Sequence, residues 1–156
     1  MTVSISKYLQ LETTLSRLGA SGQRAAIHEL AGLLLKALPQ FDPNELVSAL
    51  EQRERYYSTA TLEGLAFPFI ETHQVQEPVI ALACSLDGVE FGSPQGELTH
   101  IFVALIIPSS TPKLSMQLLA RLTRLFQSQP SLRDQLLACD EPQELYESFV
   151  KVESAL

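Results

Sequence analysis

The sequence predicts a single α/β domain over residues 1–156. Its length is that of one domain, and a chain of this size buries roughly 68–70% of the surface that it exposes when unfolded. Apolar residues recur at helical spacing near both ends, whereas short apolar runs typical of strands occupy the middle. No internal repeat, low-complexity tract or linker divides the chain. One domain of strands and helices therefore accounts for the whole pattern.

The N-terminal part is predicted to contain a short opening element, an edge strand and a first long helix. Residues 3–10 favour a short helix or turn, and Thr13–Leu18 favours an edge strand. The helix is expected over Gln23–Leu38, with Ser21 as its N-cap and Pro39 after its end. Apolar residues spaced by three or four positions define its buried face: Ile27, Leu30, Leu34 and Leu38.

A second helix and three strands are predicted to follow. Asp42–Glu45 supplies an N-cap, a proline at the first helical position and a glutamate placed for a capping box, so this helix is expected to run to about Arg55. Short apolar runs at Leu65–Phe69, Pro78–Ser85 and His100–Ile107 predict strands. The last run is almost continuously apolar, as expected for a strand buried on both faces of a sheet, so it is predicted to be central.

The remaining segments are predicted to form a turn region and three helices. Asp87-Gly88 and Gly92–Gly96 have turn chemistry, which favours a loop or an irregular strand. Thr111–Ser128 is expected to be a long helix opened by its Thr-Pro pair, and Pro130–Ala138 a short one. Asp140–Gln143 repeats the cap-and-proline pattern before a terminal helix. The apolar positions of the long and terminal helices are Leu118, Leu122, Leu125 and Phe126, and Leu145, Phe149 and Val152.

The charge balance argues against a nucleic-acid partner. Eighteen acidic and eleven basic residues give a formal net charge of −7, which disfavours a surface that follows phosphates. Arg121, Arg124 and Arg133 cluster in the last third of the chain. Because they recur at helical spacing, they are predicted to form a solvated face.

Cysteine usage and hydropathy predict a cytoplasmic protein without membrane insertion. Cys84 lies in an apolar run and Cys139 in a helical one, which favours a reduced chain. The first eleven residues lack the apolar core of a signal peptide, and nothing approaches the roughly 20 apolar residues of a membrane span. No paired-histidine metal spacing, phosphate-binding glycine loop or nucleophile elbow occurs. Neither a metal nor a cofactor is therefore expected.

Three short motifs suggest a family. They are Arg53-Glu54, Ser58-Thr59 and Gly64–Pro68, the last of which reads Gly-hydrophobic-Ala-hydrophobic-Pro. This segment resembles enzyme IIA of the phosphoenolpyruvate-dependent sugar phosphotransferase system, in its fructose/mannitol and nitrogen-regulatory class. The resemblance covers nearly the whole chain, including Leu46-Val47 and Leu119–Leu122. It implies a mixed, mostly parallel five-stranded sheet flanked by helices on both sides.

The residue that carries the family's chemistry is replaced in this chain. In the family, a His-Gly pair directly follows the proline, and the histidine accepts a phosphoryl group from the histidine-containing phosphocarrier protein. This chain has Phe69-Ile70 there, and a phenyl ring has no lone pair to attack phosphorus. Ala60–Glu63 also stands where the family has a glycine-rich turn. The resemblance implies that Phe69 is a degenerate acceptor position, with Ser58, Thr59, Gly64, Pro68 and Ile70 lining the pocket around it.

The chain's three histidines have different expected roles. His100 resembles the family's second histidine, which implies a place beside position 69; the alternative is a strand-end histidine satisfied by a backbone carbonyl or water. His73 lies four residues beyond Phe69 in an expected loop. Four extended residues reach up to about 13–14 Å, so His73 could replace the acceptor only after a large rearrangement. His28 is predicted to be a surface or boundary residue.

Two functions follow from the resemblance. The first is a non-canonical enzyme IIA-like regulatory or interaction protein that is not phosphorylated at position 69 and works through the phosphocarrier protein, a transporter or a regulator. The alternative is an active phosphoryl carrier, a phosphohistidine phosphotransferase component that uses His100 or His73 as its acceptor. A third possibility, a small molecule bound in the apolar pocket, has little support in the sequence.

Overall fold

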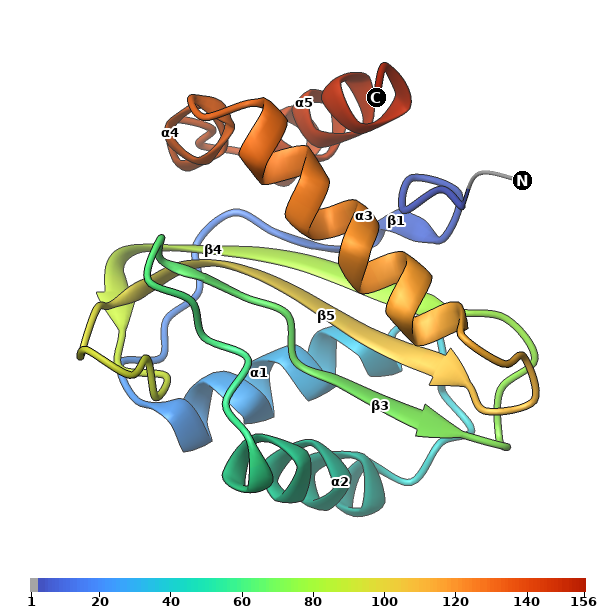
Figure 1. Ribbon diagram of the computed structural model, residues 1–156. Helices are drawn as coiled ribbons and strands as arrows, with labels where there is room; N and C mark the ends of the chain where they lie inside the picture. The colour runs from blue at the N-terminus through green and yellow to red at the C-terminus, as the bar shows by residue number, and fades with distance from the viewer. Residues whose placement is uncertain (1–2) are drawn as a thin grey trace.

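A computed structural model describes residues 3–156, which form one five-stranded sheet between two layers of helices (Figure 1). The strands are β1 (Leu9–Leu15), β2 (Leu65–Ala66), β3 (Phe69–Thr72), β4 (Val79–Val89) and β5 (Thr99–Pro108). The helices are α1 (Gln23–Leu35), α2 (Pro43–Tyr56), α3 (Leu114–Ser128), α4 (Leu132–Leu137) and α5 (Pro142–Ser154).

Strand β5 lies at the centre of the sheet, as predicted. It pairs with β4 on one side and with both β2 and β3 on the other, and β1 lies beyond β4 at the edge. Only the β4–β5 pairing is antiparallel among the described strands; β1–β4, β2–β5 and β3–β5 are parallel. Residues 101–108 of β5 are all buried. The mixed, mostly parallel sheet is therefore confirmed, and its apolar central strand is explained by coverage on both faces.

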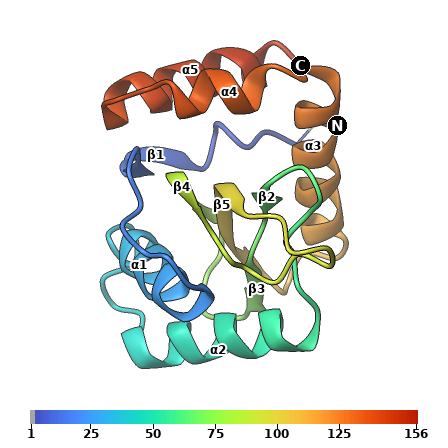
Figure 2. The same cartoon turned by 90° about the vertical axis from the view of Figure 1, so that its left-hand side faces the viewer.

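Helices cover both faces of the sheet (Figure 2). One apolar core joins α1 and α2 to one face through residues such as Ile27, Leu46 and Phe102. The other joins α3, α4 and α5 to the opposite face through residues such as Leu122 and Phe149. Alternate β5 side chains belong to the two cores, because successive side chains of a strand point to opposite faces.

The predicted strand at Leu65–Phe69 is instead two strands. Leu65 pairs with Ile101 and Phe69 with Leu105, so β2 and β3 follow the same edge of β5. They are separated by Phe67-Pro68, and Pro68 has no N–H to donate to the ladder. Its carbonyl still accepts the Leu105 N–H at 2.9 Å. The polar segment after Phe69, expected to be a loop, begins as strand β3.

The other strands also differ from prediction at their ends. Strand β1 begins at Leu9 and ends at Leu15, before the predicted end at Leu18, and a turn around Ile5 precedes it. Strand β4 continues through Asp87-Gly88, which were expected to form a turn. The pairing register of β4 with β5 shifts between Cys84 and Val89, and Gly88 adopts a φ of +90° within this irregular stretch.

Helix starts were predicted less well than helix bodies. Asp42 caps α2 as predicted, accepting the Asn44 N–H at 3.0 Å, but Glu45 bonds the Gln74 side chain and makes no capping box. Helix α1 has Gly22 as its N-cap and no side-chain cap, so Ser21 is not one. Helix α3 begins at Leu114, after Lys113 at φ +66°. The remaining differences are small: α1 ends at Leu35, α4 spans Leu132–Leu137, and Glu141 rather than Asp140 is the N-cap of α5.

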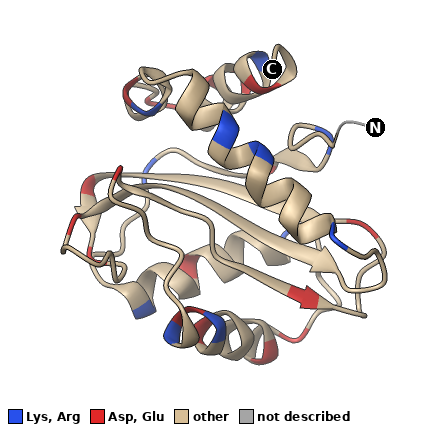
Figure 3. Ribbon diagram, viewed as in Figure 1, with Lys and Arg blue, Asp and Glu red and all other residues tan. Residues whose placement is uncertain are grey.

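The prediction of a solvated arginine face is wrong for Arg121. Arg121 is buried and forms an ion pair with Glu153, whose side chain is fully buried. The Glu153 carboxylate also accepts the backbone N–H groups of Ser6 at 2.9 Å and Ile5 at 3.2 Å. Arg124 is exposed, as predicted, and Arg133 is half-buried. Figure 3 shows both signs of charge distributed over several elements.

The two cysteines are free and buried. Burial raises the pKa of Cys84 to about 12, with a further contribution from nearby Cys139. A thiol with such a pKa is almost entirely protonated near neutral pH, and the thiolate is the reactive form. Cysteine chemistry therefore has no support at Cys84.

Candidate functional site

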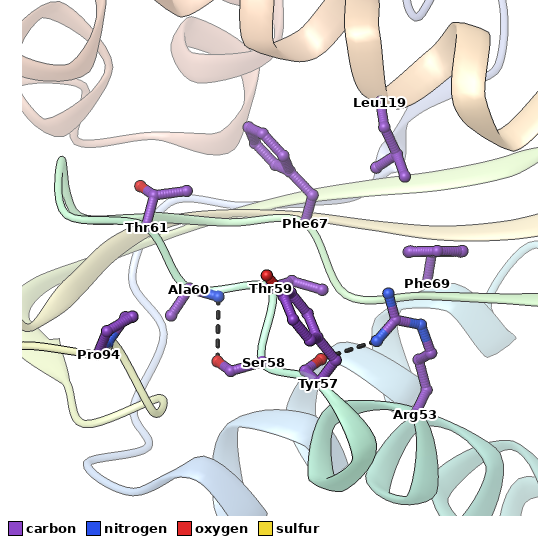
Figure 4. A pocket seen from close by; sticks show the side chains of 10 residues that line it. All are labelled: Arg53, Tyr57, Ser58, Thr59, Ala60, Thr61, Phe67, Phe69, Pro94 and Leu119. Atoms are coloured by element: carbon purple, nitrogen blue, oxygen red, sulfur yellow. Dashed lines mark hydrogen bonds between the residues drawn. The ribbon is translucent and has the colours of Figure 1, made fainter.

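A pocket of about 500 Å³ opens where the end of α2, the following loop, β3 and α3 meet (Figure 4). Arg53 and Phe69 form one side, and residues 57–61 form the floor. Phe67 and Leu119 supply an apolar wall from above, as drawn in Figure 4. Pro94 lies at the far rim. The pocket therefore contains the segment that the sequence identifies as the degenerate acceptor site.

Arg53 supplies the pocket's only formal charge among its lining residues. Its Nη1 donates to the Tyr57 carbonyl at 2.7 Å, and its guanidinium carbon lies 4.6 Å from the centre of the Phe69 ring. Arg53 takes part in none of the ion pairs of residues 3–156. The guanidinium therefore stacks on Phe69 with part of its hydrogen-bonding capacity unused, which suits recognition of an anion.

Glu54 fixes the loop that forms the floor of the pocket. Its Oε2 accepts the Thr59 N–H at 2.9 Å and its Oε1 accepts the Thr59 hydroxyl at 2.6 Å. Burial raises the pKa of Glu54 above 4.5, although the Thr59 hydrogen bonds and nearby Arg53 oppose the shift. The Arg-Glu and Ser-Thr motifs thus act together: Glu54 holds the loop while Arg53 faces the pocket.

Two substitutions of Glu54 should separate hydrogen bonding from charge. Glu54→Ala leaves both Thr59 groups unpaired and should reduce the free energy of unfolding by about 1–3 kcal/mol. Glu54→Gln keeps the shape and can satisfy both Thr59 groups, so it should change that free energy by less than about 1 kcal/mol. Urea unfolding of the three proteins at one pH measures both effects.

The pH dependence of the same proteins tests the raised pKa. A carboxyl whose pKa is higher in the folded state contributes stability that is complete below its unfolded pKa and is lost as pH rises through the folded value. The wild type should therefore lose stability relative to Glu54→Gln as pH increases above 4.5. A difference between the two proteins that stays constant with pH would contradict this assignment.

The serine and threonine hydroxyl groups of the pocket are occupied by structural hydrogen bonds. Ser58 Oγ donates to the Phe91 carbonyl at 3.2 Å and accepts the Ala60 N–H at 3.2 Å. Thr61 Oγ1 accepts the Leu65 N–H at 3.2 Å. No histidine, cysteine or carboxylate lines the pocket beside them. The lining therefore has an anion-binding group but lacks a nucleophile with an adjacent general base.

The predicted pocket-lining residues divide into two groups. Ser58 and Thr59 line the pocket, whereas Gly64, Pro68 and Ile70 do not. Ile70 points into the core beneath α1 and α2. Gly64, at φ +79°, makes the turn into β2, and its carbonyl accepts the His100 N–H at 2.8 Å. These three residues therefore shape the backbone around the site.

His100 does not lie beside Phe69, contrary to the expectation from the resemblance. Phe69 pairs with Leu105, five residues after His100 on β5, which separates the two positions by about 16 Å along the strand. Its Nδ1 lies 2.9 Å from the Ser85 carbonyl oxygen. Because a carbonyl can only accept, Nδ1 must donate a proton. His100 is thus the strand-end histidine satisfied by a backbone carbonyl that was the alternative interpretation.

His73 and His28 are both exposed, as predicted. His73 lies in the turn after β3, with its Nδ1 2.8 Å from the Ser109 hydroxyl. Neither residue lines the pocket. The structure therefore brings none of the three histidines into the pocket around Phe69.

The sequence does not point to three of the pocket's residues. Tyr57 follows α2 and is largely exposed, Pro94 comes from the loop after β4, and Leu119 comes from α3. The Tyr56-Tyr57 pair next to Ser58 is a usable signal, because two large aromatic side chains outside an apolar stripe often mark a contact surface. Pro94 and Leu119 have no such local signal, since only the tertiary fold brings them to the site.

Residues 3–156 include no group of three or more His, Cys, Asp or Glu side chains arranged to hold a metal ion. Over the same described range, none of the helices combines the length and apolar character needed to cross a bilayer.

Solved structures with this arrangement include enzyme IIA proteins of the phosphotransferase system. The nitrogen regulatory protein IIA-Ntr of Neisseria meningitidis superposes with a TM-score of 0.78 at 21% identity, covering 92% of this chain and 97% of that one. Enzyme IIA for mannitol of Escherichia coli, solved in complex with phosphorylated enzyme IIB, gives a TM-score of 0.75 at 20% identity, with 92% and 99% covered. The fold is therefore that of an enzyme IIA domain.

Sequence comparison identifies the family as well as the fold. A nitrogen regulatory protein of Pseudomonas aeruginosa is 22% identical over 152 residues, which is 97% of this chain and 98% of that protein. Residues 7–152 match the family described as phosphoenolpyruvate-dependent sugar phosphotransferase system, EIIA 2. The chain belongs to this family.

Proposed function

We propose that this protein is a regulatory or interaction member of the EIIA 2 family that accepts no phosphoryl group at the usual loop position. One observation carries the proposal: Phe69, at the position expected to hold the acceptor, lies beneath the Arg53 guanidinium in a pocket lined by no histidine. The Arg53 guanidinium stacks on the phenyl ring, whereas beside a phosphorylated histidine it would face the phosphoryl group. The site keeps an anion-binding group and lacks the atom that would form a bond to phosphorus.

The surface around the pocket supports a protein partner. Tyr57 lines the pocket and is 72% exposed. Its neighbour Tyr56 is 90% exposed, and Met116, three residues before the lining residue Leu119 on α3, is 67% exposed. Aromatic residues and methionine are enriched at protein interfaces. The Escherichia coli relative was solved as a complex with enzyme IIB, which supports a partner of that kind, a phosphocarrier protein or a regulator for this chain.

The alternative function, an active phosphoryl carrier, rests best on His73. Its ring is exposed, and its Nδ1 is positioned by Ser109 at 2.8 Å, which leaves Nε2 without a protein partner among the described residues. A neutral imidazole with one oriented nitrogen can act as a nucleophile through the other. His100 is half-buried, with Nδ1 donating to Ser85, and has a similar but less accessible free nitrogen.

A labelling experiment distinguishes the two functions. The full chain is incubated with radiolabelled phosphoenolpyruvate, the general phosphotransferase and the phosphocarrier protein, and acid-labile, base-stable label on each protein is measured. We expect label on the phosphocarrier, which is the internal control, and none on this chain. Stoichiometric label on this chain would contradict the proposal.

If label appeared, two variants would identify its position. Loss of label in His73→Ala but not in His100→Ala would establish His73 as the acceptor, and the opposite result would establish His100. Both substitutions are made outside the pocket, so the residues around Phe69 stay unchanged.

A further inference from the structure

A second pocket lies on the other side of Phe67. It has a volume of about 340 Å³ and is formed by β2, the preceding loop, the C-terminal half of α3 and the turn into α4. Phe67 and Thr61 line both this pocket and the one around Phe69. Its volume is within the range of small-molecule sites in proteins. Nothing in the proposed function uses this pocket.

The walls of the second pocket are apolar and contain two aromatic rings. Leu65, Phe67, Phe126 and Pro130 supply this surface. The rings of Phe67 and Phe126 lie 6.2 Å apart between their centroids, at an interplanar angle of 30°. Thr123 and Gln127 add neutral polar groups from α3. These walls suit a flat apolar group, such as an aryl ring.

Arg133 gives the pocket a cation that forms no ion pair with another described residue. Its Nη1 donates to the Glu63 carbonyl at 2.9 Å, which holds the side chain against the loop. Its Nε is buried and has no hydrogen-bond partner. Arg133 forms none of the ion pairs found among residues 3–156.

The free edge of this guanidinium matches a carboxylate. With Nη1 bonded to Glu63, the Nε–Nη2 edge has no hydrogen-bond acceptor from residues 3–156. A desolvated donor without an acceptor costs free energy, which a bound acceptor would recover. A carboxylate in the pocket accepts from both nitrogens of such an edge when the side chain shifts enough to uncover the buried Nε.

We propose that this second pocket binds a small organic acid, with an aryl group packed against the Phe67–Phe126 pair and a carboxylate on Arg133. The apolar walls supply contact area, and the charge-assisted hydrogen bonds fix the ligand's orientation. Glu63 also lines the pocket, with an exposed side chain that opposes an anion. The electrostatic part of the affinity is therefore the attraction of the ligand's carboxylate to Arg133 minus its repulsion by Glu63.

Matched acids and amides test this on the unmodified full chain. Benzoate, phenylacetate and 3-phenylpropionate are titrated against the 15N-labelled protein, each beside its neutral carboxamide of the same shape. We expect saturable amide shifts at Phe67, Thr123 and Gln127, with at least one acid binding about tenfold more tightly than its amide. Failure of all three acids to give saturable shifts there, or equal affinity for each acid and its amide, would overturn the proposal.

Two substitutions assign the effect to the charged residues. Arg133→Gln should abolish the preference for acid over amide, and Glu63→Gln should tighten acid binding roughly two- to fivefold. A preference that persists in Arg133→Gln would also overturn the proposal. The acid–amide comparison in the wild type stays decisive if Arg133→Gln folds poorly. Because these ligands are tested without any phosphotransferase component, the result is independent of whether the chain accepts phosphate.

Discussion

Replacing Glu153 by Gln is expected to reduce the free energy of unfolding by about 3–5 kcal/mol, because it leaves the buried Arg121 guanidinium without a counter-charge. Glu153 is fully buried, and Arg121 is 9% exposed. The same carboxylate accepts the N–H groups of Ile5 and Ser6, and the Arg121 Nη2 bonds the Glu153 carbonyl at 2.9 Å. At about 2–4 °C per kcal/mol for a domain of this size, the melting temperature should fall by roughly 6–20 °C.

A surface ion pair provides the matched control. Arg17 and Asp140 lie 2.9 Å apart, with side chains 38% and 84% exposed. Asp140→Asn removes the same charge from that pair and should cost less than about 1 kcal/mol. Equal losses in Glu153→Gln and Asp140→Asn, measured by urea unfolding, would show that burial of the Arg121–Glu153 pair has no special weight.

The pH dependence of the Glu153 effect has the opposite sign to that of Glu54. Burial alone would raise the pKa of Glu153, but hydrogen bonds from Ser6, Arg121 and Ile5 outweigh it and hold the pKa below 4.5. A carboxyl with a depressed pKa contributes stability above its unfolded value, and that stability is lost as pH falls through the folded value. The difference between wild type and Glu153→Gln should therefore shrink below pH 4.5.

Replacing Phe69 by His is expected to produce a protein that is labelled by phosphoenolpyruvate through the phosphocarrier, where the wild type is not. The substitution places an imidazole nitrogen beneath Arg53, whose guanidinium carbon lies 4.6 Å from the present ring centre. Arg53 can then neutralise charge on the incoming phosphoryl group. Glu54 and Thr59 already hold the neighbouring loop. Label per mole of protein should rise from background to a substantial fraction of one.

Two further variants make this result specific. Phe69→Asn adds polarity at the same position without an imidazole nucleophile and should stay unlabelled. Arg53→Ala combined with Phe69→His should label at least about a hundredfold more slowly, because a preorganised charge at the reacting group is lost. A Phe69→His protein that remains unlabelled would contradict the view that the nucleophile is the main missing element.

Much of the fold could be predicted because its signals are local. The apolar run at His100–Ile107 indicated the central strand, and the Asp42-Pro43 cap indicated the start of α2. One error missed a local signal: Pro68 has no N–H to donate to the ladder, so it divides the predicted strand into two strands that both pair with β5. Another arose where a tertiary contact overrides local preference. The helical spacing of Arg121 predicts a solvated side chain, but it is buried because it forms an ion pair with Glu153, 32 residues away in the sequence.

The site was less predictable because it is assembled from separate segments. Arg53, Ser58, Thr59 and Phe69 were found, since the motifs that mark them are contiguous in the sequence. Leu119 and Pro94 were not, since they come from α3 and from the loop after β4. The predicted position of His100 was wrong because it depends on the pairing register of β3 and β5. Phe69 pairs with Leu105, five residues after His100, and the sequence of a strand does not reveal its register.

The contact between Glu153 and residues 5–6 also bears on how the chain could be reconnected. It joins segments 147 and 148 residues apart, so both ends of the described chain are fixed on one side of the sheet (Figure 1). Proteins whose termini lie close together tolerate circular permutation when new ends open in an exposed loop. The exposed turn at Pro94–Gly96 meets that condition. A short linker from residue 156 to residue 3 would then keep the α5 contact while freeing the pocket's rim at Pro94.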